Sequence, residues 1–206
     1  MSYPRGEFLS DLMERGDSED AGQSFWLEPQ VPIAGFLKRA VRSYASDDEQ
    51  AANELKDIPD GDIIAPEVAK ALPLCESPIE RILLPWLLAQ EYTPFGRPTV
   101  MLPGEGGRLE YAKLALVPQL PIGRFRADFA LVGKGREFIR FFIIECDGAD
   151  YHDQDKDAAR DAQIRSLNKN VRSITRLTGG LIMNDPRGAA EQVRLAVSRE
   201  YGYWGQ

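Results

Sequence analysis

Four large apolar residues in a row, Phe141 to Ile144, constrain the fold of this 206-residue chain more than any other feature of its sequence. Such a run, followed by polar residues, is typical of a strand that is buried on both faces of a sheet. The predicted strand spans residues 138–147 and carries Glu145 and Asp147 at its end, where alternation places both acids on one face. A carboxylate directly after a buried run is costly without a partner, so we expect Glu145 to have one.

The segment that follows this strand has two interpretations. Asp147 and Gly148 form a common turn sequence, and the same aspartate is also a candidate for a functional role beside Glu145. His152, the single histidine of the chain, follows the turn. It is either a surface residue or a group that handles protons, because an imidazole titrates at about pH 6.5.

Hydrophobic periodicity predicts an α/β fold for the second part of the chain. The expected order is helix, three strands, helix, strand, helix, at about 77–90, 112–120, 123–132, 138–147, 154–169, 171–177 and 185–201. The first helix begins with Ser77 as its N-cap, and Glu80 completes a capping box three residues later. That local role accounts for Glu80 without any catalytic function.

A hairpin between the strands at 123–132 and 138–147 brings a second carboxylate toward Glu145. It places Asp128 opposite about residue 143, diagonal to Glu145, with about 7–8 Å between the backbones. A turn one residue longer or shorter would move Asp128 to the other face, and the alternative for Asp128 is an exposed residue at a strand end. Converging carboxylates repel each other and have raised pKa values. A divalent cation relieves that repulsion, and such oxygen ligands suit Mg²⁺.

The first part of the chain differs in charge from the rest. Residues 1–75 hold 7 Lys and Arg against 15 Asp and Glu, whereas residues 76–206 hold 18 against 17. An acidic chain argues against nucleic-acid binding, but here the acidity belongs to one region. We expect residues 1–74 to form a separate helical region, with helices at 33–45 and 66–72 and a short one between them. This region covers the basic part, docks a protein partner, or only keeps the chain soluble.

The cysteines and the apolar segments bear on location. Cys75 and Cys146 form neither a CxxC pair nor a disulfide framework, and both have apolar neighbours, so we expect them to be reduced and buried. No apolar run approaches the roughly 18 residues of a membrane span, and the N-terminus lacks the features of a signal peptide. These features predict a cytoplasmic protein without membrane contact.

The order and spacing of several motifs resemble one nuclease superfamily. The segment "RADFAL" contains Asp128, Glu145 follows 17 residues later within "IIECDG", and His152 comes next. This arrangement resembles the PD-(D/E)XK nucleases, and most closely their branch of very-short-patch repair endonucleases, over about residues 75–200. "QLPIGRFRADFAL" is similar to the family's lead-in strand, and "ARDAQIRSLNKNVRSITRLTG" to its closing helix and strand.

The resemblance implies a restriction-endonuclease-like core, αβββαβ with a mixed central sheet flanked by helices. That core would be a nuclease-like domain at 75–206, with residues 1–74 as an N-terminal helical appendage. The implied activity is that of a metal-dependent endonuclease, a hydrolase that cleaves DNA phosphodiester bonds with Mg²⁺ or Mn²⁺. DNA repair and defence are the two settings that this reading leaves open.

The resemblance also assigns residues to the site. The implied metal ligands are Asp128, Glu145 and the carbonyl oxygen of Cys146. Glu80 would face the site from the first helix, and Gln119 aligns with a glutamine at the end of the first strand. The full set of implied catalytic residues is Glu80, Asp128, Glu145, Asp147 and His152.

One position departs from the superfamily pattern. The motif ends in a lysine that orients or activates the attacking water, and Asp147 stands there in this chain. The closer branch also has an acid at that position, so activity is still expected. His152, Lys156 and Gln163 are the candidates to take over the role of the lysine.

Basic side chains of the second region are candidates for DNA contacts, because a guanidinium group matches a phosphate well. They are Arg124, Arg126, Lys156, Arg160, Arg165 and Arg172. The alternative for each is a place on a solvated face. Two further functions stay open: a catalytically inactive nuclease-fold module that binds nucleic acid or a protein partner, and an effector or toxin docked through the acidic region.

Overall fold

A computed structural model describes residues 7–8, 48–104, 108–109, 113–134, 139–147 and 154–202. At its centre is a five-stranded sheet with the order β2-β4-β5-β6-β7. These strands span β2 Thr99–Val100, β4 Leu114–Ile122, β5 Phe125–Lys134, β6 Ile139–Asp147 and β7 Val171–Thr178. β5 runs antiparallel to both neighbours, whereas the β2–β4 and β6–β7 pairs are parallel, so the sheet is mixed. The short strands β1 Glu7–Phe8 and β3 Arg108–Leu109 form a separate antiparallel pair.

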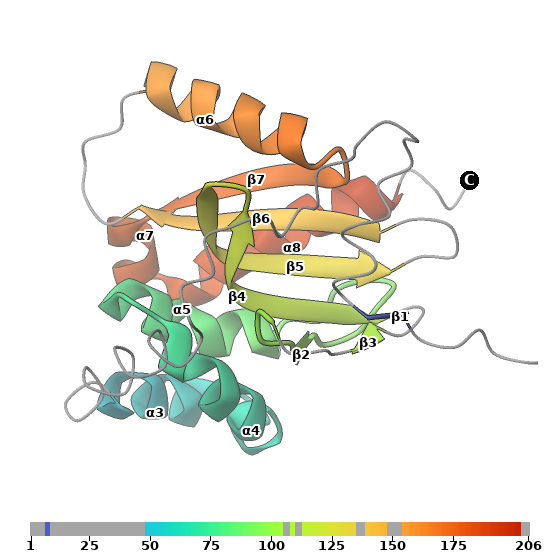
Figure 1. Ribbon diagram of the computed structural model, residues 1–206. Coiled ribbons are helices and arrows are strands. Elements are labelled where there is room, and N and C mark those ends of the chain that lie inside the picture. The colour runs from blue at the N-terminus through green and yellow to red at the C-terminus, as the bar shows by residue number, and fades with distance from the viewer. Residues whose placement is uncertain are drawn as a thin grey trace, which may run out of the picture.

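Helices cover both faces of the sheet. They span α3 Asp48–Asp57, α4 Gly61–Ala71, the 3₁₀ turn η1 Leu72–Leu74, α5 Pro78–Ala89, α6 Gln154–Leu167, α7 Gly179–Asn184 and α8 Pro186–Gly202. In Figure 1, α6 lies on one side of the sheet and α5, α7 and α8 lie on the other, with α3 and α4 packed beyond α5. A mixed sheet between two layers of helices confirms the predicted α/β class.

The elements predicted after residue 77 are present, with ends shifted by one or two residues. Three described elements after residue 77 were not predicted: β2 and β3, which lie in and at the end of the loop rich in Gly and Pro, and α7, which is capped by Thr178. The Oγ1 atom of Thr178 accepts a hydrogen bond from the N–H of Leu181 at 3.2 Å. α4 begins earlier than the predicted helix at 66–72, and the helix predicted at 33–45 lies outside the described residues.

The apolar run of β6 is buried on both of its faces, as its sequence predicted. Phe142 and Ile144 pack in the cluster on the α5 and α8 side of the sheet. Phe141 and Ile143 pack in the cluster on the α6 side, together with Ile164 of α6. Because both faces of the strand are anchored, the residues that follow Ile144 are held at a defined place on the sheet.

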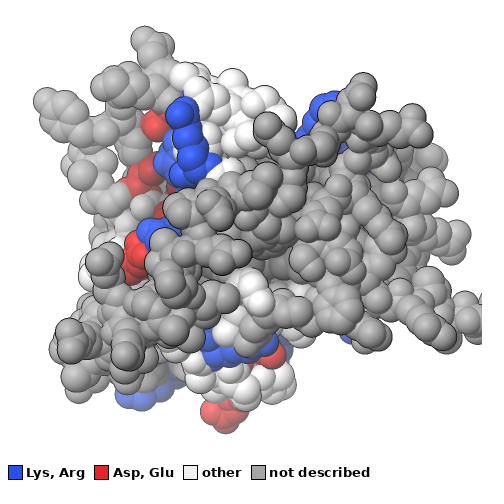
Figure 2. Space-filling view, viewed as in Figure 1, with Lys and Arg blue, Asp and Glu red and all other residues white. Residues whose placement is uncertain are grey.

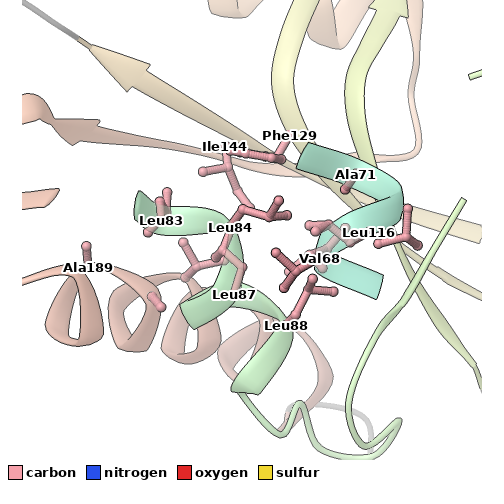
Figure 3. Packing of buried hydrophobic residues seen from close by; sticks show 14 of the residues in the cluster. Val68, Ala71, Leu83, Leu84, Leu87, Leu88, Leu116, Phe129, Ile144 and Ala189 are labelled. Carbon is pink, nitrogen blue, oxygen red and sulfur yellow. The ribbon is translucent and has the colours of Figure 1, made fainter. Parts of the chain in front are cut away.

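α3 and α4 pack on α5 and share its hydrophobic core. Figure 3 shows Val68 of α4 beside Leu84 and Leu88 of α5. The indole Nε1 of Trp86 in α5 donates to an oxygen of Glu54 in α3 at 2.5 Å. The two acidic helices are therefore joined to the sheet domain by buried apolar contacts. The domain boundary predicted at residue 75 stays a prediction.

The β4–β5 hairpin bends sharply in the middle of both strands. Gln119 has a backbone φ of 52°, a conformation that is uncommon for a residue with a side chain. The regular pairs Pro118–Phe129 and Leu120–Ala127 lie on either side of the bend. Figure 1 shows the end of this hairpin rising across the sheet toward α6. At its tip, Gly123 has a backbone φ of 58°, a left-handed conformation that favours glycine.

The bend changes which side chains face α6. Before it, Ala115 and Val117 of β4 pack in the cluster on the α6 side; after it, Leu120 and Ile122 do so. The alternation of side chains therefore slips by one residue at Gln119. Because β5 slips at the same point, the pairing beyond the bend is kept.

Candidate active site

Asp128 and Glu145 lie level with each other where the β5–β6 ladder ends. The last regular pair is Phe129 with Ile144, and the next residue on each strand is one of the two acids. The prediction that Asp128 lies opposite about residue 143 was therefore wrong by two residues. A shift of two keeps the parity of the pairing, so Asp128 is still at a position that corresponds to Glu145.

Asp128 is fixed to β6 through its side chain. Its Oδ2 atom accepts a hydrogen bond from the backbone N–H of Cys146 at 2.6 Å. Partial burial raises the pKa of Asp128, and the negative charge of Asp147 adds to this, while the bond from Cys146 and the charges of Arg160 and Arg126 oppose it. The carboxylate is thus held in place in surroundings that disfavour its charge.

Glu145 is almost completely buried, with 3% of its surface exposed. Burial raises the pKa of Glu145 to about 7; Arg160 opposes the shift and Asp128 adds to it. The Nη2 atom of Arg160 lies 3.1 Å from each of the two carboxylate oxygens. The expectation that Glu145 has a partner is confirmed, and the partner is a guanidinium group on α6.

Ser77 and Glu80 form a cap at the start of α5 that matches the predicted capping box in the bond to Ser77 Oγ, while the backbone N–H bound by the carboxylate is that of Glu76, one residue before the predicted one. The hydroxyl of Ser77 donates to Oε1 of Glu80 at 2.6 Å, and the N–H of Glu80 donates to Ser77 Oγ at 3.3 Å. The backbone N–H of Glu76 donates to Oε2 at 2.9 Å. Burial raises the pKa of Glu80, these hydrogen bonds oppose the shift, and the charge of Asp128 adds to it. Glu80 therefore caps its helix and also lies within electrostatic reach of Asp128.

Gln119 links Glu80 to the bend of the hairpin. Its Nε2 atom donates to Oε2 of Glu80 at 2.9 Å. Its Oε1 atom is buried and has no hydrogen-bond partner among the residues that the structure describes. A strained backbone and an unsatisfied amide oxygen at one residue are features that cluster at functional sites. Sequence reasoning reached Gln119 only through the resemblance, because no local pattern signals the bend.

Asp147 faces an arginine that sequence reasoning missed. Its Oδ1 atom lies 3.6 Å from Nη1 of Arg176 on β7. Arg176 also lies 3.5 Å from Asp157 and 2.7 Å from Asp161, both on α6. The spacing of Asp157 and Asp161, four residues apart on one helix face, was the available signal. The acid Asp147 thus pairs with a basic residue from the next strand.

Both cysteines lie close to these acids. Cys75 is buried, Cys146 is half-buried, and both are free. Burial raises the pKa of each thiol, and the nearby carboxylates Glu80 and Asp128 add to the shift. The thiols therefore stay protonated at neutral pH.

The basic candidates fall into two groups. Arg124, at the hairpin tip, donates to Gln163 of α6 at 2.5 Å and lies 5.0 Å over the ring of Phe125. Arg160 lies 5.9 Å from the same ring centroid, so both guanidinium groups gather where the bent hairpin meets α6. Arg126 pairs with Glu76 instead.

Figure 2 shows acidic and basic atoms side by side at the left of the view, within the described part of that face, instead of one uniform basic patch. Arg165 donates to the backbone carbonyl of Arg172 at 3.2 Å, away from the carboxylates. His152 lies outside the described residues. Lys156 belongs to α6, but its side chain is not among the described ones. Gln163 accepts a hydrogen bond from Arg124 at the hairpin tip.

The donor set of the site fits a hard divalent cation. In the described part of the chain, His, Cys, Asp and Glu side chains form no group of three or more that is arranged to hold a metal ion. Mg²⁺ is commonly bound by only one or two carboxylates, with water and substrate phosphate completing its shell. Asp128 and Glu145 provide two such carboxylates, both in surroundings that a cation would relieve.

Among the described helices, none combines the length and the apolar character that crossing a membrane requires. Comparison of the chain with protein-family models, with curated proteins and with solved structures found no match.

Proposed function

We propose that this protein is a metal-dependent endonuclease that hydrolyses DNA phosphodiester bonds. The observation that carries the proposal is the juxtaposition of Asp128, which is half-buried, and Glu145, which is buried, at the end of the ladder between adjacent strands, both with raised pKa values. Structural ion pairs also shift pKa values, but strongly perturbed acids gathered at one sheet end favour a functional site. The motifs that resemble PD-(D/E)XK nucleases supply the reaction class, and the mixed sheet between helices is compatible with a restriction-endonuclease-like core.

In this proposal Asp128 and Glu145 hold Mg²⁺ or Mn²⁺. When bound there, the cation supplies Lewis-acid polarisation of the phosphate and a lowered pKa of bound water. The hydrogen bond from Cys146 N–H keeps Asp128 oriented, and the two-sided packing of β6 keeps Glu145 in place. Glu80 and Gln119 are held together on the α5 side by their mutual hydrogen bond, with Glu80 within electrostatic reach of Asp128.

DNA phosphates would be bound where the bent hairpin meets α6. Arg124 and Arg160 lie there with their guanidinium groups near Phe125, and guanidinium groups bind phosphate oxygens in bidentate fashion. The role of the absent lysine passes to His152 or Lys156 in this proposal. Asp147 has a different part: its contact with Arg176 fixes the end of β6 to β7.

A catalytically inactive nuclease-fold module is the second candidate, and one observation favours it. Arg160 engages both oxygens of Glu145, and Arg176 is shared by three aspartates, so arginines already offset part of the negative charge of these acids without any cation. Such a module would bind nucleic acid or a protein partner and would bind no divalent cation through Asp128.

One experiment separates the two candidates. The full chain is incubated with supercoiled plasmid, linear duplex, single-stranded DNA and RNA, each with Mg²⁺ and with EDTA. The nuclease proposal expects cleavage of at least one DNA substrate with Mg²⁺ and none with EDTA. Absence of cleavage, together with no heat of Mg²⁺ or Mn²⁺ binding in calorimetry, would leave the inactive module as the better account.

A further inference from the structure

Arg160 and Glu145 form an unequal ion pair. A single nitrogen of Arg160, Nη2, lies 3.1 Å from both oxygens of Glu145 and 3.3 Å from the backbone carbonyl of Arg126. The Glu145 side chain is only 4% exposed, whereas the Arg160 side chain is 33% exposed. The glutamate is therefore fixed by the core, and the arginine reaches it from the solvent side.

The guanidinium group occupies the oxygens that a cation would need. Both oxygens of Glu145 are engaged by Arg160. The positive charge of Arg160 also acts on Asp128, where it opposes the rise in pKa. A divalent cation held by these two acids would lie next to Arg160, and like charges at such a distance repel. Cation and guanidinium therefore compete for one carboxylate.

The surroundings of Arg160 offer its guanidinium group a second position away from Glu145. It extends from α6, one face of which meets the tip of the β4–β5 hairpin, and its guanidinium lies 5.9 Å from the ring centroid of Phe125. Arg124 lies over the same ring at 5.0 Å. A guanidinium that leaves Glu145 would stay beside Arg124 on the solvent side, where two such groups form a binding place for a phosphate.

We infer that Arg160 is an exchangeable counter-ion: it holds Glu145 in place when no cation is bound, and it is released toward substrate phosphate when a divalent cation takes Glu145. This inference rests on the proposed function, because it needs a cation at Asp128 and Glu145. It makes Arg160 a positioning residue that couples cation binding to DNA binding.

Calorimetric titration of the full chain with Mg²⁺ tests the competition. The titration is done at about pH 8.5, above the pKa of Glu145, so that the carboxylate is ionised. Arg160→Gln is expected to bind Mg²⁺ about tenfold more tightly than the wild type, because a partly buried competitor is removed. Arg124→Gln is the matched control: it loses the same charge near the same ring but has no contact with Glu145, and its affinity should change by less than about twofold.

A spectroscopic measurement tests the release directly. In protein with ¹⁵N-labelled arginine, the side-chain signal of Arg160 is identified by its loss in Arg160→Gln. Addition of Mg²⁺ to the wild type should shift this signal, while that of Arg194, which pairs with Glu191 on α8, stays nearly unchanged. If the substitution to Gln prevents folding, Arg160→Lys, which keeps the charge and loses the fork, should bind Mg²⁺ with intermediate affinity.

The outcomes separate this inference from the proposed function. Equal Mg²⁺ affinity of wild type and Arg160→Gln, or an equal gain in Arg124→Gln, overturns the counter-ion role even if the wild type cleaves DNA. Binding by Arg160→Gln but not by the wild type would support the inference and contradict the nuclease activity of the natural chain. If neither protein binds Mg²⁺, both proposals fall.

Discussion

The backbone N–H of Cys146 donates a hydrogen bond to Oδ2 of Asp128 at 2.6 Å. This bond replaces the regular β5–β6 ladder, which stops one residue earlier at Phe129 and Ile144. It holds the Asp128 carboxylate against Cys146, the residue that follows Glu145. This one contact therefore fixes the position of Asp128 relative to Glu145, the other candidate metal ligand.

The first prediction concerns Asp128 itself. Asp128→Asn keeps an oxygen that can accept from Cys146 but removes the charge, so the fold should persist. Cation-dependent DNA cleavage should fall by at least about 10²-fold, because the substitution removes a metal ligand itself and not only a residue that positions a ligand. Circular dichroism checks the fold and a plasmid assay checks the rate, with Glu145→Ala assayed in parallel. Cleavage at the wild-type rate by either variant would show that the site is elsewhere.

The second prediction concerns the dependence of stability on pH. The pKa of Glu145 is about 7 in the folded protein against an ordinary value of 4.5, so the folded state binds the proton more tightly. The contribution of this group to the free energy of unfolding is highest below about pH 4.5 and falls as the pH rises to about 7. Glu145→Gln mimics the protonated form, so the variant does not lose this contribution to the free energy of unfolding as the pH rises.

At about pH 8, Glu145→Gln should therefore be more stable than the wild type by up to about 3 kcal/mol, and the difference should vanish toward about pH 4.5. Urea denaturation at a series of pH values measures it. Glu191→Gln serves as control, because Glu191 is on α8 and its pKa is lowered by its hydrogen bond with Arg194. A stability difference that does not depend on pH would contradict the raised pKa of Glu145.

The third prediction concerns the capping box of α5. Ser77→Ala removes the N-cap and should cost about 1 kcal/mol. Glu80→Ala also leaves the N–H of Glu76 and the Nε2 of Gln119 without their acceptor, and should cost about 1–3 kcal/mol. Thermal unfolding compares the two. A smaller cost for Glu80→Ala than for Ser77→Ala would mean that the buried charge of Glu80 outweighs its hydrogen bonds.

The fourth prediction concerns Arg176, whose guanidinium is shared by Asp147, Asp157 and Asp161. Arg176→Met leaves three carboxylates near one another and should destabilise the protein by about 1–3 kcal/mol. The loss should shrink in high salt, which screens the repulsion. Arg172→Met, at an exposed position of the same strand, is the control and should have little effect. Equal stabilities of the two variants would refute the role given to Arg176.

The fifth prediction concerns the acidic helices. A chain that starts at residue 75 would lose Ile64 and Val68 from the core, and each buried side chain of this size is worth about 1.5–3 kcal/mol. We expect this chain to have a much lower melting temperature, while a chain that starts at residue 47 keeps α3 and α4 and melts near the full chain. Equal melting of the chain from residue 75 would establish a separable appendage.

The chain from residue 47 tests the hypothesis of an acidic cover for residues 1–46 alone, which hold 5 Lys and Arg against 7 Asp and Glu; the more acidic helices α3 and α4 remain in it. DNA affinity is measured at low and high salt for this chain and for the full chain, because phosphate binding depends on charge. Tighter binding at low salt without residues 1–46 would support the cover. The same affinity for both chains would exclude a covering role for that segment.

The local patterns of the sequence determined the secondary structure and the caps. The capping box at Ser77 and Glu80 was predicted, and so was the burial of β6 on both faces, because each depends on residues close together in the chain. The same is true of the antiparallel pairing between β5 and β6, two strands that are close together in the sequence.

Only the tertiary structure decided how the site is assembled. The two-residue difference in register, the bend at Gln119 and the partners Arg160 and Arg176 depend on how the hairpin packs on α6 and β7. The backbone of Gln119 adopts its strained conformation only because contacts on both sides of the bend compensate for it. A charged group finds its partner through folding and not through sequence distance, so the sequence determined which acids are present, and packing decided which bases face them.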